Sequence, residues 1–156
     1  MKGSVIKYEQ DNIDTDVIIP GPYLKIHDYA ELAKHAMEGL DKDFHKRVKP
    51  GDFIVAGKNF GCGSSREQAA IALKGAGVKA VIAPKFARIF FRNAINIGLP
   101  LIECDCPCQN GAMITVDLTN GFVEIGNKKI AIGPLSDRMR AILEAGGLVE
   151  FLGGSR

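Results

Sequence analysis

The sequence is poor in the features that mark membrane, secreted and nucleic-acid-binding proteins. It has no tryptophan, no run near the roughly 18 apolar residues of a membrane helix, and no apolar core of signal-peptide length in its opening MKGSVIKYEQDN. Its Lys and Arg residues are spread along the chain and leave a net charge of +2. Nucleic-acid binders usually concentrate basic residues on one face. We therefore expect a cytoplasmic protein that binds neither membrane nor nucleic acid.

Linkers, internal repeats and low-complexity tracts are also absent. The 156 residues, 46% of them hydrophobic and 24% charged, suit one soluble domain with one core. We expect a single mixed α/β domain over residues 1–156, and an enzyme or enzyme subunit as its default function.

Cysteine is scarce outside the stretch CDCPC, which holds Cys104, Cys106 and Cys108. Without an export signal, a disulfide framework is not expected. The C-x-C-x-C spacing also differs from the C-x₂-C pairs of zinc sites and from common iron–sulfur runs. We expect exposed loop thiols, prone to oxidation or intermolecular pairing, and no metal on this chain.

The hydrophobic pattern predicts a parallel sheet with helical crossovers, followed by antiparallel hairpins. A first strand is expected at 3–8. Period-two alternation over 112–133, with turn signals at Asn120-Gly121 and Gly126-Asn127, predicts the hairpins. A final helix is expected from Ser136 to Gly146. The crossover region is expected to run as strand 53–56, helix 65–76, strand 78–85, a helix over 86–98 with Phe86, Ile89, Phe90, Ala94 and Ile97 inward, and strand 99–104.

Residues 20–48 form a polar excursion that we expect to be a mobile flap around a short helix. The apolar run 17–19, ended by Pro20, is expected to be a strand. Asp28 is the expected N-cap of a helix that ends at Gly39. That helix would place Leu32, Ala36 and Leu40 on one stripe.

The stretch NFGCGSSREQAA, residues 59–70, follows a predicted strand directly and opens a predicted helix. Gly61 and Gly63 permit a tight turn, and Arg66 can grip a carboxylate with two nitrogens. A helix start also offers free N–H groups and partial positive charge. This combination favours an anion site. The alternative is simple helix capping, by Ser64 with Glu67 or by Ser65 with Gln68.

Other chemistries fit this stretch less well. A Cys62 nucleophile would need a histidine base, yet His27, His35 and His45 all fall in the flap segment. The phosphate-loop pattern G-x-x-x-x-G-K-[ST] and the nucleophile elbow G-x-S-x-G are both absent.

The stretch NIDTDVIIP places Asp11, Asp14 and Asp16 ahead of the apolar run. These side chains are candidates for turn-forming hydrogen bonds to the backbone. A buried aspartate at the strand start would instead orient a serine or an arginine. The residues alone leave both readings open.

Together, the blocks NIDTDVIIP, GPYLK, GKNFGCGSSREQAA, APKFARIFFRNAINIGLPLIE and ILEAGGLVEFL resemble the small subunit of 3-isopropylmalate dehydratase, the swivelling domain of the aconitase superfamily. The resemblance covers essentially the whole chain. It implies an α/β fold with β/β/α layers and a mixed sheet. It also implies docking onto a large subunit that holds a [4Fe–4S] cluster, in a heterodimer or heterotetramer. Self-association of the free chain is left open.

The resemblance also implies a reaction and roles for particular residues. The reaction is a hydro-lyase step of leucine biosynthesis, which moves a hydroxyl by dehydration and rehydration on a small hydroxy acid. Ser64 matches the serine whose alkoxide is the general base, and Asp16 matches a second catalytic position. The matching substrate-binding positions are Thr15, Gly63, Ser65 and Arg66.

A specificity loop is implied at Tyr23, Leu24, Lys25 and Ile26. Archaeal-type isopropylmalate enzymes resemble Y-L-V-Y there and homoaconitases Y-L-R-T, whereas this chain has Y-L-K-I. Ile26 favours an apolar substituent, and Lys25 suits a third carboxylate. The substrate is thus open among isopropylmalate, homocitrate-type acids and methyl-substituted malates. An anion-binding α/β module without catalysis, and a scaffold that uses the CDCPC loop, are the non-enzyme alternatives.

Overall fold

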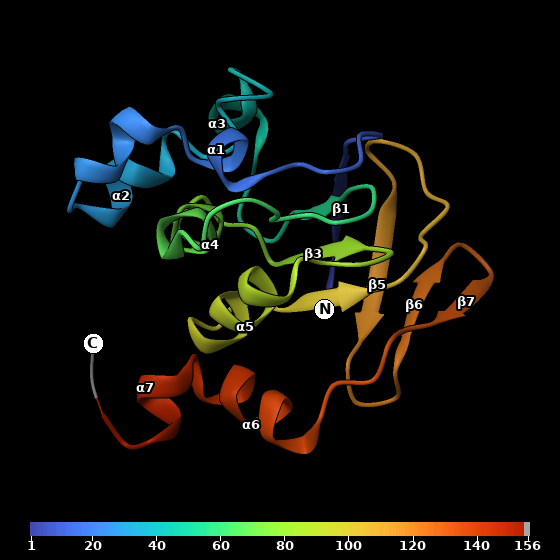
Figure 1. Cartoon of the computed structure of the whole chain (residues 1–156). Helices are drawn as coiled ribbons and strands as arrows, with labels where there is room; N and C mark the ends of the chain where they lie inside the picture. The colour runs from blue at the N-terminus through green and yellow to red at the C-terminus, as the bar shows by residue number, and fades with distance from the viewer. Residues whose placement is uncertain (155–156) are drawn as a thin grey trace.

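The computed structural model describes residues 1–154, which build a curled seven-stranded sheet flanked by helices (Figure 1). The strand order is β4-β3-β2-β1-β5-β6-β7. Neighbours among the first four strands pair in parallel and the remaining pairs are antiparallel, which confirms the predicted parallel core and hairpins. The strands are β1 (Lys2–Lys7), β2 (Phe53–Val55), β3 (Ala80–Ala83), β4 (Leu101–Glu103), β5 (Met113–Asp117), β6 (Phe122–Ile125) and β7 (Lys128–Ala131).

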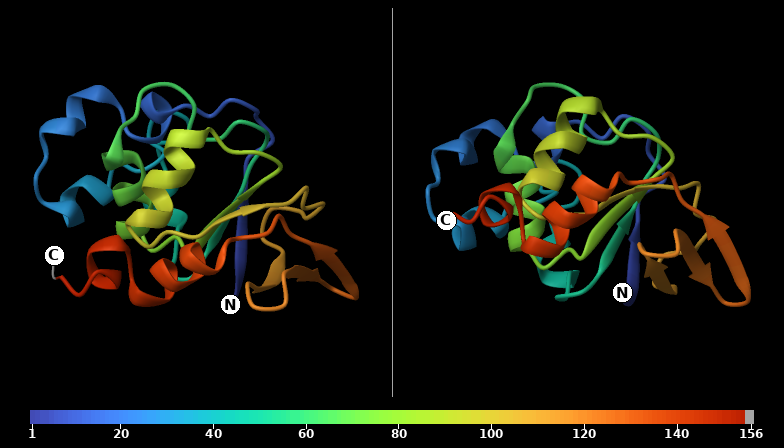
Figure 2. Two further views of the ribbon diagram at one scale, coloured as in Figure 1. Left: turned by 60° about the horizontal axis from the view of Figure 1, so that its bottom comes forward. Right: turned by 90° about the horizontal axis from the view of Figure 1, so that it is seen from below.

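The central parallel strands β2 and β3 are buried on both faces, which explains their continuous apolar sequences. Alternate residues enter two cores. Ile54 and Val81 belong to the core beneath the helices, whereas Phe53 and Ile82 belong to a second core shared with Ile114 and other residues of the antiparallel strands. The antiparallel strands curl away from the helices (Figures 1 and 2). The curled sheet therefore forms two layers and the helices form the third, as the predicted β/β/α layering requires.

Two nine-residue helices, α4 (Glu67–Gly75) and α5 (Arg88–Asn96), form the crossovers between parallel strands. In α5, Phe90 and Ala94 are buried as predicted, but Ile89 is 56% exposed, so its predicted inward position is wrong. α6 (Asp137–Ala145) confirms the C-terminal helix, with the Ser136 hydroxyl accepting from the Met139 amide at 3.1 Å. A further turn, α7 (Leu148–Phe151), was not predicted.

The apolar run 17–19 is not a strand. The Asp14 carboxylate accepts a hydrogen bond from the Val17 amide at 2.9 Å, and this closes the helical turn α1 (Thr15–Ile18). A short buried run has no periodicity that separates the two structures. The chain continues through η1 (Gly21–Lys25), α2 (Tyr29–Ala33) and α3 (Phe44–Arg47).

The predicted helix from Asp28 is confirmed at its start and wrong in its length. The Asp28 side chain accepts from the Ala30 amide, but α2 ends at Ala33. Beyond it, Met37 has φ of 61°, a left-handed conformation that a helix does not continue through. Leu32, Met37 and Phe44 are fully buried, so this segment contributes to the core.

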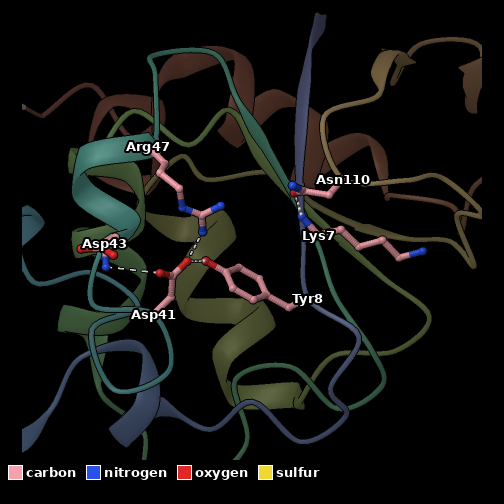
Figure 3. Close-up of polar contacts among 6 residues, drawn as sticks. All are labelled: Lys7, Tyr8, Asp41, Asp43, Arg47 and Asn110. Carbon is pink, nitrogen blue, oxygen red and sulfur yellow. Dashed lines mark hydrogen bonds and ion pairs between the residues drawn. The ribbon is translucent and has the colours of Figure 1, made fainter.

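A polar cluster fastens the end of the 20–48 segment to the end of β1 (Figure 3). The Tyr8 hydroxyl donates to Asp41 Oδ2 at 2.8 Å, Arg47 pairs with the same carboxylate, and the Asp43 amide donates to Asp41 Oδ1 at 3.2 Å. Burial, and then the Asp41 carboxylate, raise the pKa of Tyr8, which keeps the phenol a donor. The mobility expected of residues 20–48 stays a prediction.

The three clustered cysteines are buried, so the expectation of exposed loop thiols is wrong. Cys104, Cys106 and Cys108 are only 6%, 5% and 4% exposed, because all three thiols pack into the second core. Small apolar thiols are well suited to such packing. Among residues 1–154, no group of three or more His, Cys, Asp or Glu side chains is placed to hold a metal ion. None of the helices in that range has the length and apolarity needed to cross a bilayer.

Candidate functional site

Three loops at the carboxyl ends of β1, β2 and β3 are joined by backbone hydrogen bonds. In the middle loop, the Gly61 amide donates to Ile13 O at 2.8 Å on one side. On the other side, the Ala87 amide donates to Phe60 O at 3.0 Å. This edge of a parallel sheet is where ligands bind in open α/β folds. The pairing brings residues from three distant parts of the sequence together.

A cleft of about 310 Å³ opens where these loops meet. A larger hollow of about 490 Å³ lies beside Lys79 and Arg140, at the amino ends of the strands. We take the smaller cleft as the site because it lies at the edge where such folds bind ligands and contains the predicted residues. Its lining consists of Thr15, Gly61, Gly63, Ser64, Ser65, Arg66, Ala87, Arg88, Ile89, Phe90 and Asn93.

Helices α4 and α5 both begin at this cleft, and neither start is capped by a side chain. Arg66 and Ala87 are the N-cap residues, so the alternative of simple capping by Ser64 or Ser65 is wrong. The turn with φ of 94° at Gly63 places the serines before the helix. An uncapped start leaves N–H groups and partial positive charge for another acceptor. The arrangement therefore favours an anion in the cleft.

Ser64 is exposed to the cleft and held from behind by the buried Thr15. The Thr15 hydroxyl donates its one proton to the Ser64 carbonyl oxygen at 2.9 Å. The two hydroxyl oxygens lie 3.4 Å apart, so the lone pairs of Thr15 Oγ1 are available to the Ser64 proton. Thr15 thus fixes the backbone of Ser64 and lies within reach of its hydroxyl.

Arg66 is anchored by Asp16 and by the end of α1. Its Nη1 pairs with Asp16 Oδ1 and donates to Ile19 O at 3.2 Å. Asp16 therefore orients an arginine, as one of the two alternatives predicted, but its side chain is 67% exposed and not buried. Asp14 is the aspartate that shapes the turn. Because both of these contacts use Nη1, the other guanidinium nitrogens can meet a carboxylate.

Two further polar residues of the cleft were missed from the sequence. Arg88 begins α5 and Asn93 lies five residues further along the helix, and both line the same cleft as Ser64 and Arg66. The block FARIFFRN contains both. Arg88 stands at a helix start that follows a buried strand, as Arg66 does, and this similarity could have identified Arg88 from the sequence.

The specificity-loop residues Tyr23, Leu24, Lys25 and Ile26 do not line the cleft of this chain. Tyr23, Leu24 and Ile26 pack against the core, whereas Lys25 is exposed. The structure therefore brings Ser64, Ser65, Arg66, Gly63 and Thr15 together but leaves the loop outside.

Cys62 is expected to be a slow thiol. Burial, and then the Asp14 carboxylate, raise its pKa, so its thiolate fraction at neutral pH falls below that of an ordinary cysteine. We expect iodoacetamide at pH 8 to alkylate Cys62 at least about threefold more slowly than a free cysteine peptide. Peptide mass spectrometry over time measures this rate, with Cys62→Ser identifying the product. A rate faster than that of the free peptide would instead support Cys62 as a nucleophile.

Comparisons with known proteins extend over nearly the whole chain. The family model of the aconitase C-terminal domain matches residues 1–105. A 3-isopropylmalate dehydratase small subunit of Caldicellulosiruptor saccharolyticus is 54% identical over 158 aligned positions, covering 98% of this chain and 91% of the relative. A methanogen homoaconitase small subunit of Methanocaldococcus jannaschii is 53% identical, with 97% and 91% covered. The crystal structure of 3-isopropylmalate dehydratase (LeuD) from M. jannaschii gives a TM-score of 0.93 at 52% identity, covering 97% of this chain and 92% of that chain.

Proposed function

We propose that this chain, which belongs to the aconitase C-terminal domain family, is the small subunit of a 3-isopropylmalate dehydratase. Several relatives at 53% to 54% identity carry that name, and they align over 98% to 99% of this chain. The single structural observation behind the proposal is the cleft itself. Ser64, held by Thr15, stands beside an arginine that Asp16 orients, at two uncapped helix starts. The cleft suits a substrate that carries carboxylates.

In this proposal Ser64 is the general base that removes a proton from the carbon beside a carboxylate. A serine hydroxyl does not ionise unaided at neutral pH, so its alkoxide needs stabilisation by nearby positive charge and amide donors. The uncapped start of α4 and the guanidinium of Arg66 lie next to it in the chain. Arg66, with Ser65 and the backbone of Gly63, binds a substrate carboxylate. Asp16 is a positioning residue that acts through Arg66.

The partner is a large subunit, and the proposal assigns the [4Fe–4S] cluster of the family to it. The thiols of Cys104, Cys106 and Cys108 pack in a hydrophobic core and do not fit as cluster ligands. This chain supplies the base and the carboxylate-binding groups, and the complex would work in the cytoplasm with the rest of leucine biosynthesis.

Homoaconitase is the second candidate function. Two methanogen homoaconitase small subunits are also 53% identical to this chain, so overall similarity does not separate the two substrates. In the specificity loop, Lys25 is the exposed residue and suits a third carboxylate, whereas the half-buried Ile26 suits an isopropyl group.

Reconstitution with the large subunit tests the proposal. We expect the isolated chain to be colourless and inactive, and the complex to turn over isopropylmalate with kcat/KM at least about tenfold above homoaconitate-series and methylmalate substrates. Absorption at 235–240 nm, where unsaturated acids absorb, follows the reaction. A preference for the homoaconitate series would favour the second candidate. An iron–sulfur absorption band from the isolated chain would reject the assignment of the cluster. Small-anion binding without turnover in any complex would favour the non-enzyme module.

A further inference from the structure

The specificity loop is fastened by a carboxylate outside the cleft. The Tyr23 hydroxyl donates to Glu38 Oε1 at 2.6 Å, and His35 Nδ1 lies 2.5 Å from Glu38 Oε2. The rings of Tyr23 and His35 stack with centroids 3.7 Å apart and planes 7° from parallel. The Glu38 carboxylate thus binds both members of a stacked pair. Tyr23 is the first residue of the specificity loop, so its hydrogen bond to Glu38 holds the start of that loop in place.

Glu38 and Tyr23 are in the protonation states that the hydrogen bond between them needs. The hydrogen bond from Tyr23, and then the contact with His35, lower the pKa of Glu38 against the opposing effect of burial. The same bond raises the pKa of Tyr23. At neutral pH the carboxylate is therefore charged and the phenol carries its proton.

The backbone around Glu38 rests on the element that orients the candidate catalytic residues. The Met37 amide donates to Ile18 O at 2.7 Å, and the Gly39 amide donates to Val17 O at 3.0 Å. A Cβ at Gly39 would lie 2.7 Å from Val17 Cα, so only glycine permits this approach. Both carbonyls belong to α1, the turn that also carries Asp16. The loop and the anchored guanidinium of Arg66 thus share one support.

We propose that Glu38, together with His35, is the positioning residue that sets substrate specificity by fixing the start of the loop at Tyr23. Leu24 and Ile26 pack against the core while Lys25 is exposed. When the loop is released from Glu38, its side chains no longer keep these packed and exposed positions. The loop then presents different side chains to the substrate. The inference rests on the proposed function, because the loop meets substrate only in the assembled enzyme.

Glu38→Gln in the complex tests the inference, because a glutamine keeps the shape and removes the charge. We expect KM for the preferred substrate to rise about tenfold while kcat changes less than about threefold, and the preference over the other acids to shrink at least fivefold. Tyr23→Phe should reproduce this result, and the double variant should be no worse than Glu38→Gln alone, because the two residues act through one bond. The matched control is Glu31→Gln in the same segment, whose carboxylate forms an exposed ion pair with Lys34.

A second measurement does not depend on turnover. Hydrogen exchange of the isolated chain should show faster exchange of the amides of residues 24–26 in Glu38→Gln than in the wild type, and no change in Glu31→Gln. Unchanged exchange and unchanged kinetic constants would overturn the inference, as would an equal fall of kcat for all substrates. If the wild-type complex prefers another acid, the proposed function is wrong but the inference about Glu38 still stands to be tested. The KM shift is then measured with that acid.

Discussion

Ser64→Ala is expected to lower kcat of the assembled enzyme at least about 10³-fold, because it removes the hydroxyl that we propose as the general base. The change deletes one exposed atom, so assembly with the large subunit should keep its affinity. Thr15 still donates to the Ser64 carbonyl, which leaves the backbone of the site in place. Steady-state turnover together with a titration of the two subunits separates chemistry from docking.

The control for this variant is Ser136→Ala, the same chemical change at the start of α6. It removes a helix cap, which costs about 1 kcal/mol of stability, and should leave kcat unchanged. Near-normal turnover by Ser64→Ala would reject Ser64 as the base. A loss explained by weaker subunit affinity would instead make Ser64 a docking residue.

The sheet was predictable because its signals are local. Period-two alternation and the Asn120-Gly121 turn specify β5 and β6 without reference to any distant residue. The run 17–19 was assigned wrongly because a helical turn and a buried strand are equally apolar over three residues. The burial of Cys106 has a different reason: CDCPC alternates with period two, buried at each cysteine and exposed between them, but cysteine was interpreted as a reactive thiol and not as a small apolar side chain.

The site was only partly predictable, because its geometry depends on contacts between distant segments. Ser64 and Arg66 stand in one glycine-rich turn, which a single stretch of sequence reveals. The division of roles, with Asp14 shaping the turn and Asp16 orienting Arg66, depends on which aspartate meets Arg66, about fifty residues away in the chain. The place of Arg88 likewise depends on how the start of α5 packs against the turn.

Gly61→Ala tests that packing and should destabilise the protein by more than about 3 kcal/mol. Gly61 has φ of 84°, where an alanine costs about 1–2 kcal/mol. The added Cβ would also overlap the ring of Phe90, which is 3% exposed and packs edge-on against Phe60. Gly111→Ala separates the two costs, because Gly111 has φ of 86° and open space around its Cβ position.

Urea unfolding of both variants gives the two free energies. The loss for Gly111→Ala should be the backbone cost alone, and the excess for Gly61→Ala measures the close approach of α5 to the turn. That approach is what brings Arg88 to the cleft that Arg66 also lines. Equal losses of unfolding free energy in the two variants would show that α5 moves aside for the extra methyl group. The width of the cleft would then depend on the large subunit.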